Sequence, residues 1–129
     1  MRKAARVIPL ICLAGACAAG PLDGEWSVRS VGGQPLGATE TPAFLGFDAA
    51  ASRLYGSGGC NRLMAVYTAE GDALDLGEIA TTMMLCAVME PERRLLAALS
   101  GVRAFRSGDA DLRLLDSEGR VLVELERRE

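Results

Sequence analysis

Residues 56–67 read GSGGCNRLMAVY, so three glycines in four positions lead through Cys60 and Asn61 into an apolar segment. Such a stretch could be a catalytic loop built on a thiol, a phosphate-binding loop or a tight structural turn. A phosphate-binding loop needs the spacing G-x-x-x-x-G-K-[ST] and a helix after it, and neither is present here. Glycines of this kind more often form a bulge or a tight turn beside a crowded core. The stretch therefore predicts a structural corner.

A catalytic thiol at Cys60 is disfavoured because the chain contains no histidine. A nucleophilic cysteine needs a base or a cation that lowers its pKa, and a standard zinc site needs more ligands than two thiols. The carboxylates look like helix caps and solvated faces, and no pair is placed for acid–base catalysis. We therefore predict that the protein is not an enzyme. The carboxylates interpreted in this way are Glu90, Glu92, Asp109, Asp111, Glu124 and Glu126.

Methionines near the cysteines raise the question of a soft metal ion such as Cu(I). In a strand, Met83 and Met84 would face opposite ways, so at most one of them could join a site. Methionine that fills an irregular core is the ordinary interpretation, and it extends to Met64 and Met89. We expect no metal and no cofactor.

The body of the chain reads as strands separated by turns. Residues 25–31 (EWSVRSV) alternate, with Trp26 and Val28 on one face. Short apolar runs bounded by glycine-containing turns follow, and residues 111–126 predict a hairpin whose second strand places Val121, Val123 and Leu125 on one apolar face. The sequence predicts an antiparallel, curved sheet of about six to eight strands.

Residues 89–101 (MEPERRLLAALSG) break the strand period. Pro91 is tolerated in a first helical turn, acidic residues suit the positive end of a helix, and Gly101 can close it. We predict one helix of about ten residues whose apolar stripe is buried, and an α+β fold in which the sheet packs around this helix. The stripe consists of Leu95, Leu96, Leu99 and Val102.

The N-terminus reads as a secretory signal over residues 1–16, with basic residues before a short apolar run and a small-residue cleavage site. Small residues before Cys17, with Leu13 just upstream, resemble a bacterial lipobox, although Ala14 stands where leucine is usual. We expect Cys17 to be lipidated, residues 17–24 to be a short tether and residues 25–129 to form one domain. The alternative is an ordinary signal-peptidase cut and a soluble periplasmic protein.

Removal of the signal would take away Cys12, and lipidation would occupy Cys17, which leaves Cys60 and Cys86 as one pair in an oxidising compartment. A disulfide between them is expected, and two free thiols packed as small hydrophobes are the alternative.

Loss of Arg2, Lys3 and Arg6 with the signal would change the formal net charge from −3 to −6. An acidic chain without a basic stripe is a poor nucleic-acid binder, so any membrane attachment would come from the lipid anchor.

The ordered motifs of the chain resemble those of the META domain, or HslJ-like, envelope proteins. GEWSVRSVGGQPL resembles the opening tryptophan strand of the family, GGCNR its G-x-C-N motif, and LRLLDSEGRVLVELE its closing hairpin. Met83 stands where many relatives carry Arg or Lys, and Ala65 where glycine is frequent. The residues that fall on family motifs, which we expect to be mainly structural, are Gly59, Cys60, Asn61, Thr82, Met84, Cys86 and Glu92.

The resemblance implies a small sheet-and-helix domain linked to heat shock, novobiocin tolerance and envelope maintenance. We expect a monomeric, non-catalytic lipoprotein of the outer membrane that faces the periplasm and binds an unknown protein or apolar ligand. The alternative is a pilot- or inhibitor-like lipoprotein that binds a protein segment or an acyl chain in the concave sheet. An apolar groove between the helix and the sheet would favour this alternative.

Overall fold

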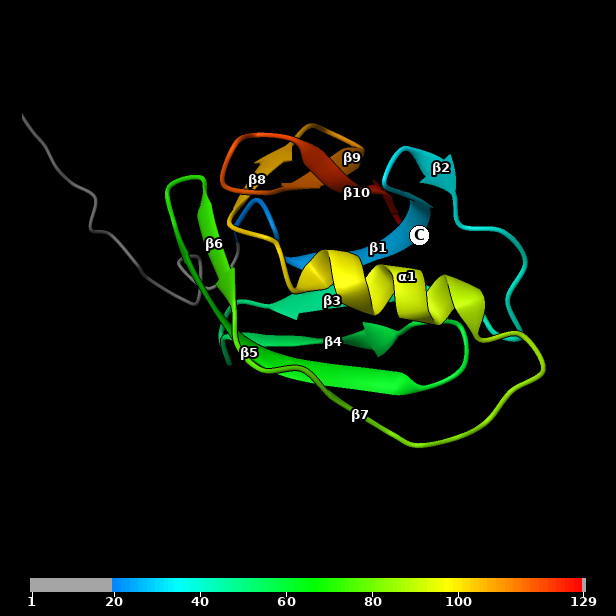
Figure 1. The fold of residues 1–129 in the computed structure, drawn as a ribbon. Coiled ribbons are helices and arrows are strands. Elements are labelled where there is room, and N and C mark those ends of the chain that lie inside the picture. The colour runs from blue at the N-terminus through cyan, green and yellow to red at the C-terminus, as the bar shows by residue number, and fades with distance from the viewer. Residues whose placement is uncertain (1–19, 129) are drawn as a thin grey trace, which may run out of the picture.

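The computed structural model describes residues 20–128 of the 129-residue chain. These residues contain ten strands and one helix (Figure 1). The predicted signal peptide (residues 1–16) and Cys17 lie outside the described residues. In chain order the elements are β1 (Gly24–Val31), β2 (Gln34–Pro35), β3 (Phe44–Asp48), β4 (Arg53–Ser57), β5 (Arg62–Glu70), β6 (Ala73–Leu76), β7 (Ala80–Thr81), α1 (Glu90–Leu99), β8 (Ala104–Ser107), β9 (Asp111–Leu115) and β10 (Val121–Arg127).

Eight of the strands form a closed barrel in which all neighbours are antiparallel. The order around the barrel is β1, β3, β4, β5, β6, β8, β9 and β10, and β10 pairs with β1 to close it. The short strands β2 and β7 pair with β1 and β5. The predicted curved sheet with one helix is correct in outline, but the sheet closes on itself. Closure depends on pairs such as Trp26 with Arg127, from opposite ends of the chain, which no local pattern reports.

The interior of the barrel is filled by alternate residues of its strands, because successive side chains of a strand point to opposite faces. Trp26 is completely buried, and its indole N–H donates a hydrogen bond to the Leu22 carbonyl oxygen at 2.8 Å. The rings of Phe47 and Tyr67 meet edge to face at 5.2 Å. The remaining buried strand residues are mostly leucine: Leu45, Leu54, Leu63, Leu74, Leu112, Leu114 and Leu125.

Helix α1 forms where the helical spacing of leucines predicted it, and it has the predicted ten residues. Figure 1 shows it between the β8–β10 strands and the β3–β5 strands, and it contacts β10 and β1. Leu95, Leu99 and the following Val102 are fully buried, and Leu96 is partly buried. The guanidinium of Arg94 donates hydrogen bonds to the carbonyl oxygens of the β1–β2 turn, including Val31 at 3.0 Å. The helix therefore closes the barrel core and is fixed to its rim.

Two details of the predicted strands and tether are corrected. Val121 is partly exposed rather than buried, because a register shift in the β10–β9 pairing between Val121 and Val123 turns it away from the core. Leu22, assigned to the tether, is buried in the core, and Asp23 Oδ1 accepts the Ala49 N–H at 2.8 Å. The folded chain therefore begins before residue 25.

Candidate functional site

The seven family-motif residues come together at one end of the barrel. Gly59, Cys60 and Asn61 form the corner between β4 and β5. Thr82, Met84 and Cys86 lie in the segment between β7 and α1, and Glu92 lies in the first turn of α1. Three chain segments that are separate in sequence therefore meet at this corner.

A disulfide joins the corner to the segment that precedes α1. Cys60 and Cys86 are bonded, their Cα atoms are 6.0 Å apart, and no free cysteine occurs within residues 20–128. The predicted disulfide is thus confirmed, and the alternative of two free thiols is excluded.

The side chain of Asn61 fixes the segment between β7 and α1 by hydrogen bonds in both directions. Its Oδ1 accepts the Met84 backbone N–H at 2.6 Å and the Thr82 hydroxyl at 2.8 Å. Its Nδ2 donates to the Met84 carbonyl oxygen at 3.2 Å. Asn61 is thus bonded to the backbone of this segment, as a structural role requires. It is not in a left-handed conformation, since Ser52 is the one non-glycine residue with positive φ within residues 20–128.

Glu92 is the buried acceptor at the centre of the corner. It is only 4% exposed, so its interpretation as a cap or solvated residue was wrong. Its Oε1 accepts the backbone N–H groups of Cys60 at 3.0 Å and Asn61 at 2.7 Å, and its Oε2 accepts Asn61 Nδ2 at 2.7 Å. A buried carboxylate is tolerated when donors satisfy it in this way. The helical spacing of the neighbouring leucines could have indicated burial, because Glu92 lies three residues before Leu95.

Gly59 is required by its backbone and by its surroundings. It has φ of 109°, and a Cβ atom at this position would lie 2.6 Å from the Thr39 side chain.

We predict that Gly59→Ala lowers the free energy of unfolding by about 1–3 kcal/mol, the usual cost of such backbone strain. Urea denaturation measures this loss. Gly71→Ala is the matched control, since Gly71 also has positive φ but an added Cβ there meets open space. Equal losses in the two variants would contradict a role for the Thr39 contact.

Large apolar side chains are exposed on the segment that the corner holds. We call residues 82–89 the apolar loop. Met83 is 91% and Leu85 is 92% exposed, and Val88 is also exposed. Residues 79–89 contain no charged side chain. The disulfide and the Asn61 hydrogen bonds therefore present apolar side chains to solvent from a fixed backbone.

An open, apolar groove of about 920 Å³ lies beside this loop on the outer face of β3, β4 and β5. Tyr55, Met64 and Ala80 are cross-strand neighbours along it, and Tyr55 covers Gly46. Sequence reasoning missed the groove, although β5 signals it by carrying apolar residues on both of its faces. The groove is lined by Thr41, Phe44, Tyr55, Gly56, Ser57, Cys60, Arg62, Leu63, Met64, Ala80, Thr81, Thr82 and Met84.

The position of this groove differs from the position that the sequence suggested. An apolar groove was expected between the helix and the concave sheet, as the feature that would favour the alternative function. The concave face is instead filled by core side chains, and Leu95 and Leu99 of α1 are buried against it. The apolar surface available for binding is on the convex face.

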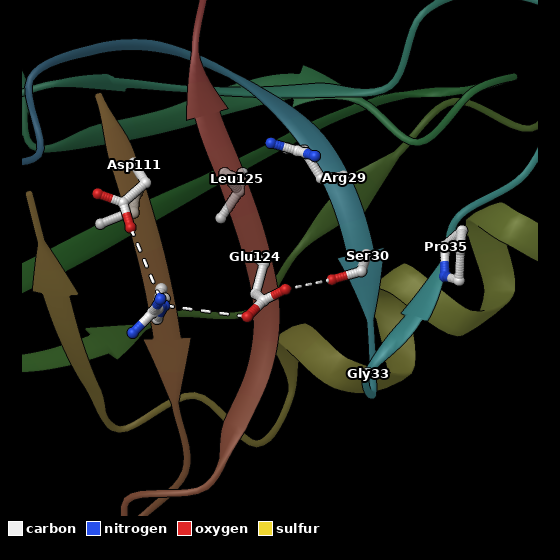
Figure 2. A pocket seen from close by; sticks show the side chains of 9 residues that line it. Arg29, Ser30, Gly33, Pro35, Asp111, Glu124 and Leu125 are labelled. Carbon is white, nitrogen blue, oxygen red and sulfur yellow. Dashed lines mark hydrogen bonds and ion pairs between the residues drawn. The ribbon is translucent and has the colours of Figure 1, made fainter.

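A second groove, of about 410 Å³, crosses the outer face of β1, β9 and β10 (Figure 2). Its charged groups satisfy one another. Glu124 accepts the Ser30 hydroxyl at 2.8 Å and pairs with Arg113 at 3.9 Å, while Arg29 pairs with Glu126 at 3.5 Å. These pairs are exposed, and such pairs contribute little to stability. The carboxylates here are solvated, as the sequence predicted.

The described chain offers no cluster of three or more His, Cys, Asp or Glu side chains that could hold a metal ion. Met89 Sδ accepts the Cys86 backbone N–H at 3.3 Å instead of joining Met64 and Met84 at the groove. Within residues 20–128, no helix has the length and apolarity that a membrane crossing requires.

Comparison with known proteins identifies the family of this chain. No curated protein sequence matches it. A protein solved by NMR shares the fold with a TM-score of 0.64 and 18% identity, over 84% of this chain and 95% of that chain. An NMR structure of a protein from Burkholderia xenovorans has a TM-score of 0.62 and 19% identity, over 98% of this chain and 95% of that chain. The crystal structure of a DUF4847 family protein from Bacteroides vulgatus has a TM-score of 0.56 and 13% identity, over 84% of this chain and 96% of that chain. These identities support likeness of fold alone.

The family assignment rests on sequence over nearly the whole described structure. The META domain matches residues 20–129, which include the disulfide, the Asn61–Glu92 corner and the closing hairpin. The resemblance inferred from the motifs is thereby confirmed, and the chain belongs to the META domain family.

Proposed function

We propose that this protein is a non-catalytic bacterial envelope protein that acts by binding a partner at the apolar loop and the neighbouring groove. The META domain family is not a known enzyme family. The observation that carries the proposal is the pair Met83 and Leu85, which are almost fully exposed on a covalently fixed segment. Exposed apolar surface of this kind marks interaction sites, and a rigid segment loses little entropy on binding.

The position of the loop supports a partner on the side away from any N-terminal anchor. Gly20 and the start of β1 lie near the β3–β4 turn, since Gly24 pairs with Phe47 and Asp23 bonds Ala49. The corner and the apolar loop follow the opposite end of β4. If Cys17 is acylated, as proposed from the lipobox, the loop would face the periplasm rather than the membrane that holds the anchor.

The proposed cellular role is tolerance of envelope stress or of an antibiotic such as novobiocin, as the resemblance implies. We predict that the double variant Met83→Gln and Leu85→Gln loses this role without loss of stability, because both side chains are in solvent. The measurement is the inhibitory concentration of novobiocin in a strain that lacks its own copy of the gene. Val121→Gln, at an exposed valine far from the apolar loop, is the control and should restore tolerance to the same level as the unaltered protein does.

Two outcomes would contradict this proposal. Full tolerance from the double variant would exclude the loop as the binding surface. Failure of the unaltered protein to restore tolerance would exclude the proposed role. Thermal unfolding of the purified variants separates a loss of tolerance from simple instability, since we expect melting temperatures within about 2 °C of the unaltered protein, as for most surface substitutions.

Anchoring of the protein is tested separately by the intact mass of the chain purified from expressing cells. An added diacylglycerol and a fatty acyl group on a chain that begins at Cys17 would support the lipoprotein proposal. An unmodified chain that begins at or near residue 17 would favour the soluble periplasmic alternative.

A further inference from the structure

Strands β3, β4 and β5, which form the floor of the groove, have no free edge to offer a ligand. Strand β4 is paired with β3 on one side and β5 on the other, β3 is also paired with β1, and β5 is also paired with β6 and β7. An extended peptide laid across these strands would bring an N–H and a C=O at each residue, and each would be costly to bury unpaired. A ligand without backbone polar groups fits this floor better.

Most polar side chains of the groove are already paired within the protein. The Tyr55 hydroxyl donates to Glu25 Oε2 at 3.0 Å, and the Thr82 hydroxyl donates to Asn61. Thr41 and Ser57 lie 3.4 Å apart and share a hydrogen bond. Burial raises the pKa of Tyr55, as does its bond to Glu25, so this phenol is neutral at physiological pH. The walls of the groove are therefore apolar and uncharged for most of their length.

Arg62 is the charged residue that lines the groove. Every ion pair within residues 20–128 is made by other arginines, so its guanidinium is available to a ligand. Its backbone is held in place, because its N–H donates to the Thr82 hydroxyl at 3.1 Å and its carbonyl oxygen accepts the Thr82 N–H. A guanidinium recognises a carboxylate or another oxyanion through paired donors.

We infer that the groove binds a free fatty acid, with the acyl chain across Phe44, Tyr55 and Met64 and the carboxylate at Arg62. The groove volume of about 920 Å³ lies within the usual range for small-molecule sites. The inference rests on the proposed function, since it names the ligand of the groove, which is one part of the proposed binding surface; Met83 and Leu85 of the apolar loop lie outside this part. It requires no covalent chemistry.

Methionine methyl groups provide a direct test. The full chain is expressed with ¹³C-methyl methionine, purified, and titrated with octanoate, decanoate and dodecanoate below their micelle concentrations. The methyl groups of Met64 and Met84, which line the groove, should shift and saturate, whereas Met83, outside it, should shift little. Affinity should tighten by up to about fourfold for each methylene added, which is the free energy of burying a CH₂ group.

Variants distinguish the two halves of the inference. Met64→Glu should abolish binding, because it places a charge in the groove, while Val66→Gln, on the same strand face but outside the groove, should leave binding unchanged. Arg62→Gln should weaken fatty-acid binding about two- to fivefold, as expected for an exposed ion pair. It should not weaken the binding of decyltrimethylammonium, whose head group is a cation and gains nothing from Arg62.

Shifts that do not saturate, that affect Met83 as strongly as Met64, or that ignore chain length would overturn the inference. If fatty acids fail to bind while the Met83→Gln, Leu85→Gln protein still loses tolerance, the ligand is wrong and the proposed function stands. In that case a photoreactive residue placed at position 64 would test for a polypeptide in the groove. A second protein crosslinked to it would show that the occupant is a polypeptide. If fatty acids bind but the double variant keeps full tolerance, the site stands and the proposed function fails.

Discussion

Replacement of Asn61 by alanine should lower the free energy of unfolding by about 3–5 kcal/mol, the range for breaking a buried network that contains a charge. The variant loses the bonds that hold Thr82 and Met84, and it leaves Glu92 Oε2 without its donor. A buried polar group that loses its hydrogen-bond partner destabilises the fold by its full desolvation penalty. This penalty is larger than the net contribution of an ordinary hydrogen bond to stability. Thermal and urea unfolding, followed by circular dichroism, measure the loss.

A matched pair of variants tests whether the buried carboxylate is the reason. Glu92→Gln should lose a similar amount, because its amide group would place a donor against a donor of Asn61 or of the corner backbone. Glu90→Gln changes an exposed carboxylate in the same helical turn and should be nearly neutral. A loss below about 1 kcal/mol in Asn61→Ala would show that the corner does not depend on this network, and would favour a binding role for Asn61.

Removal of the disulfide should lower the free energy of unfolding by about 3–4 kcal/mol. Cys60 and Cys86 are 26 positions apart, and a closed loop of this length restricts the unfolded chain by about that amount in the chain-entropy model. The double variant Cys60→Ser and Cys86→Ser should show the loss, and a reductant should produce the same loss in the unaltered protein. The reductant should have no further effect on the double variant.

The disulfide and the Asn61 network hold the same segment, so their losses should not add. Residues that share a structural unit couple, and a protein lacking both should be more stable than the sum of the two losses implies. A double-mutant cycle measures this coupling. Strict additivity, or a disulfide-free protein as stable as the unaltered one, would contradict joint fixation of the apolar loop.

The sequence by itself determined the elements whose signals are local. The helix is read from leucines at helical spacing after Pro91, and the strands from alternation between glycine-containing turns, because both depend on neighbours within a few residues. The family is likewise readable, since its motifs are ordered along the chain. The sequence also indicated the Cys60–Cys86 pair, although it left free thiols open.

Tertiary structure alone decided the features that depend on distant partners. Closure of the barrel requires β1 to meet β10, and whether Glu92 is solvated or buried depends on the corner that folds over it. The groove arises because Met64 and Tyr55 face outward from the barrel. No further element of the described chain packs over them there, whereas most apolar side chains are covered in the core. Spacing along a chain fixes which side chains share a face, but only the assembled fold fixes what that face meets.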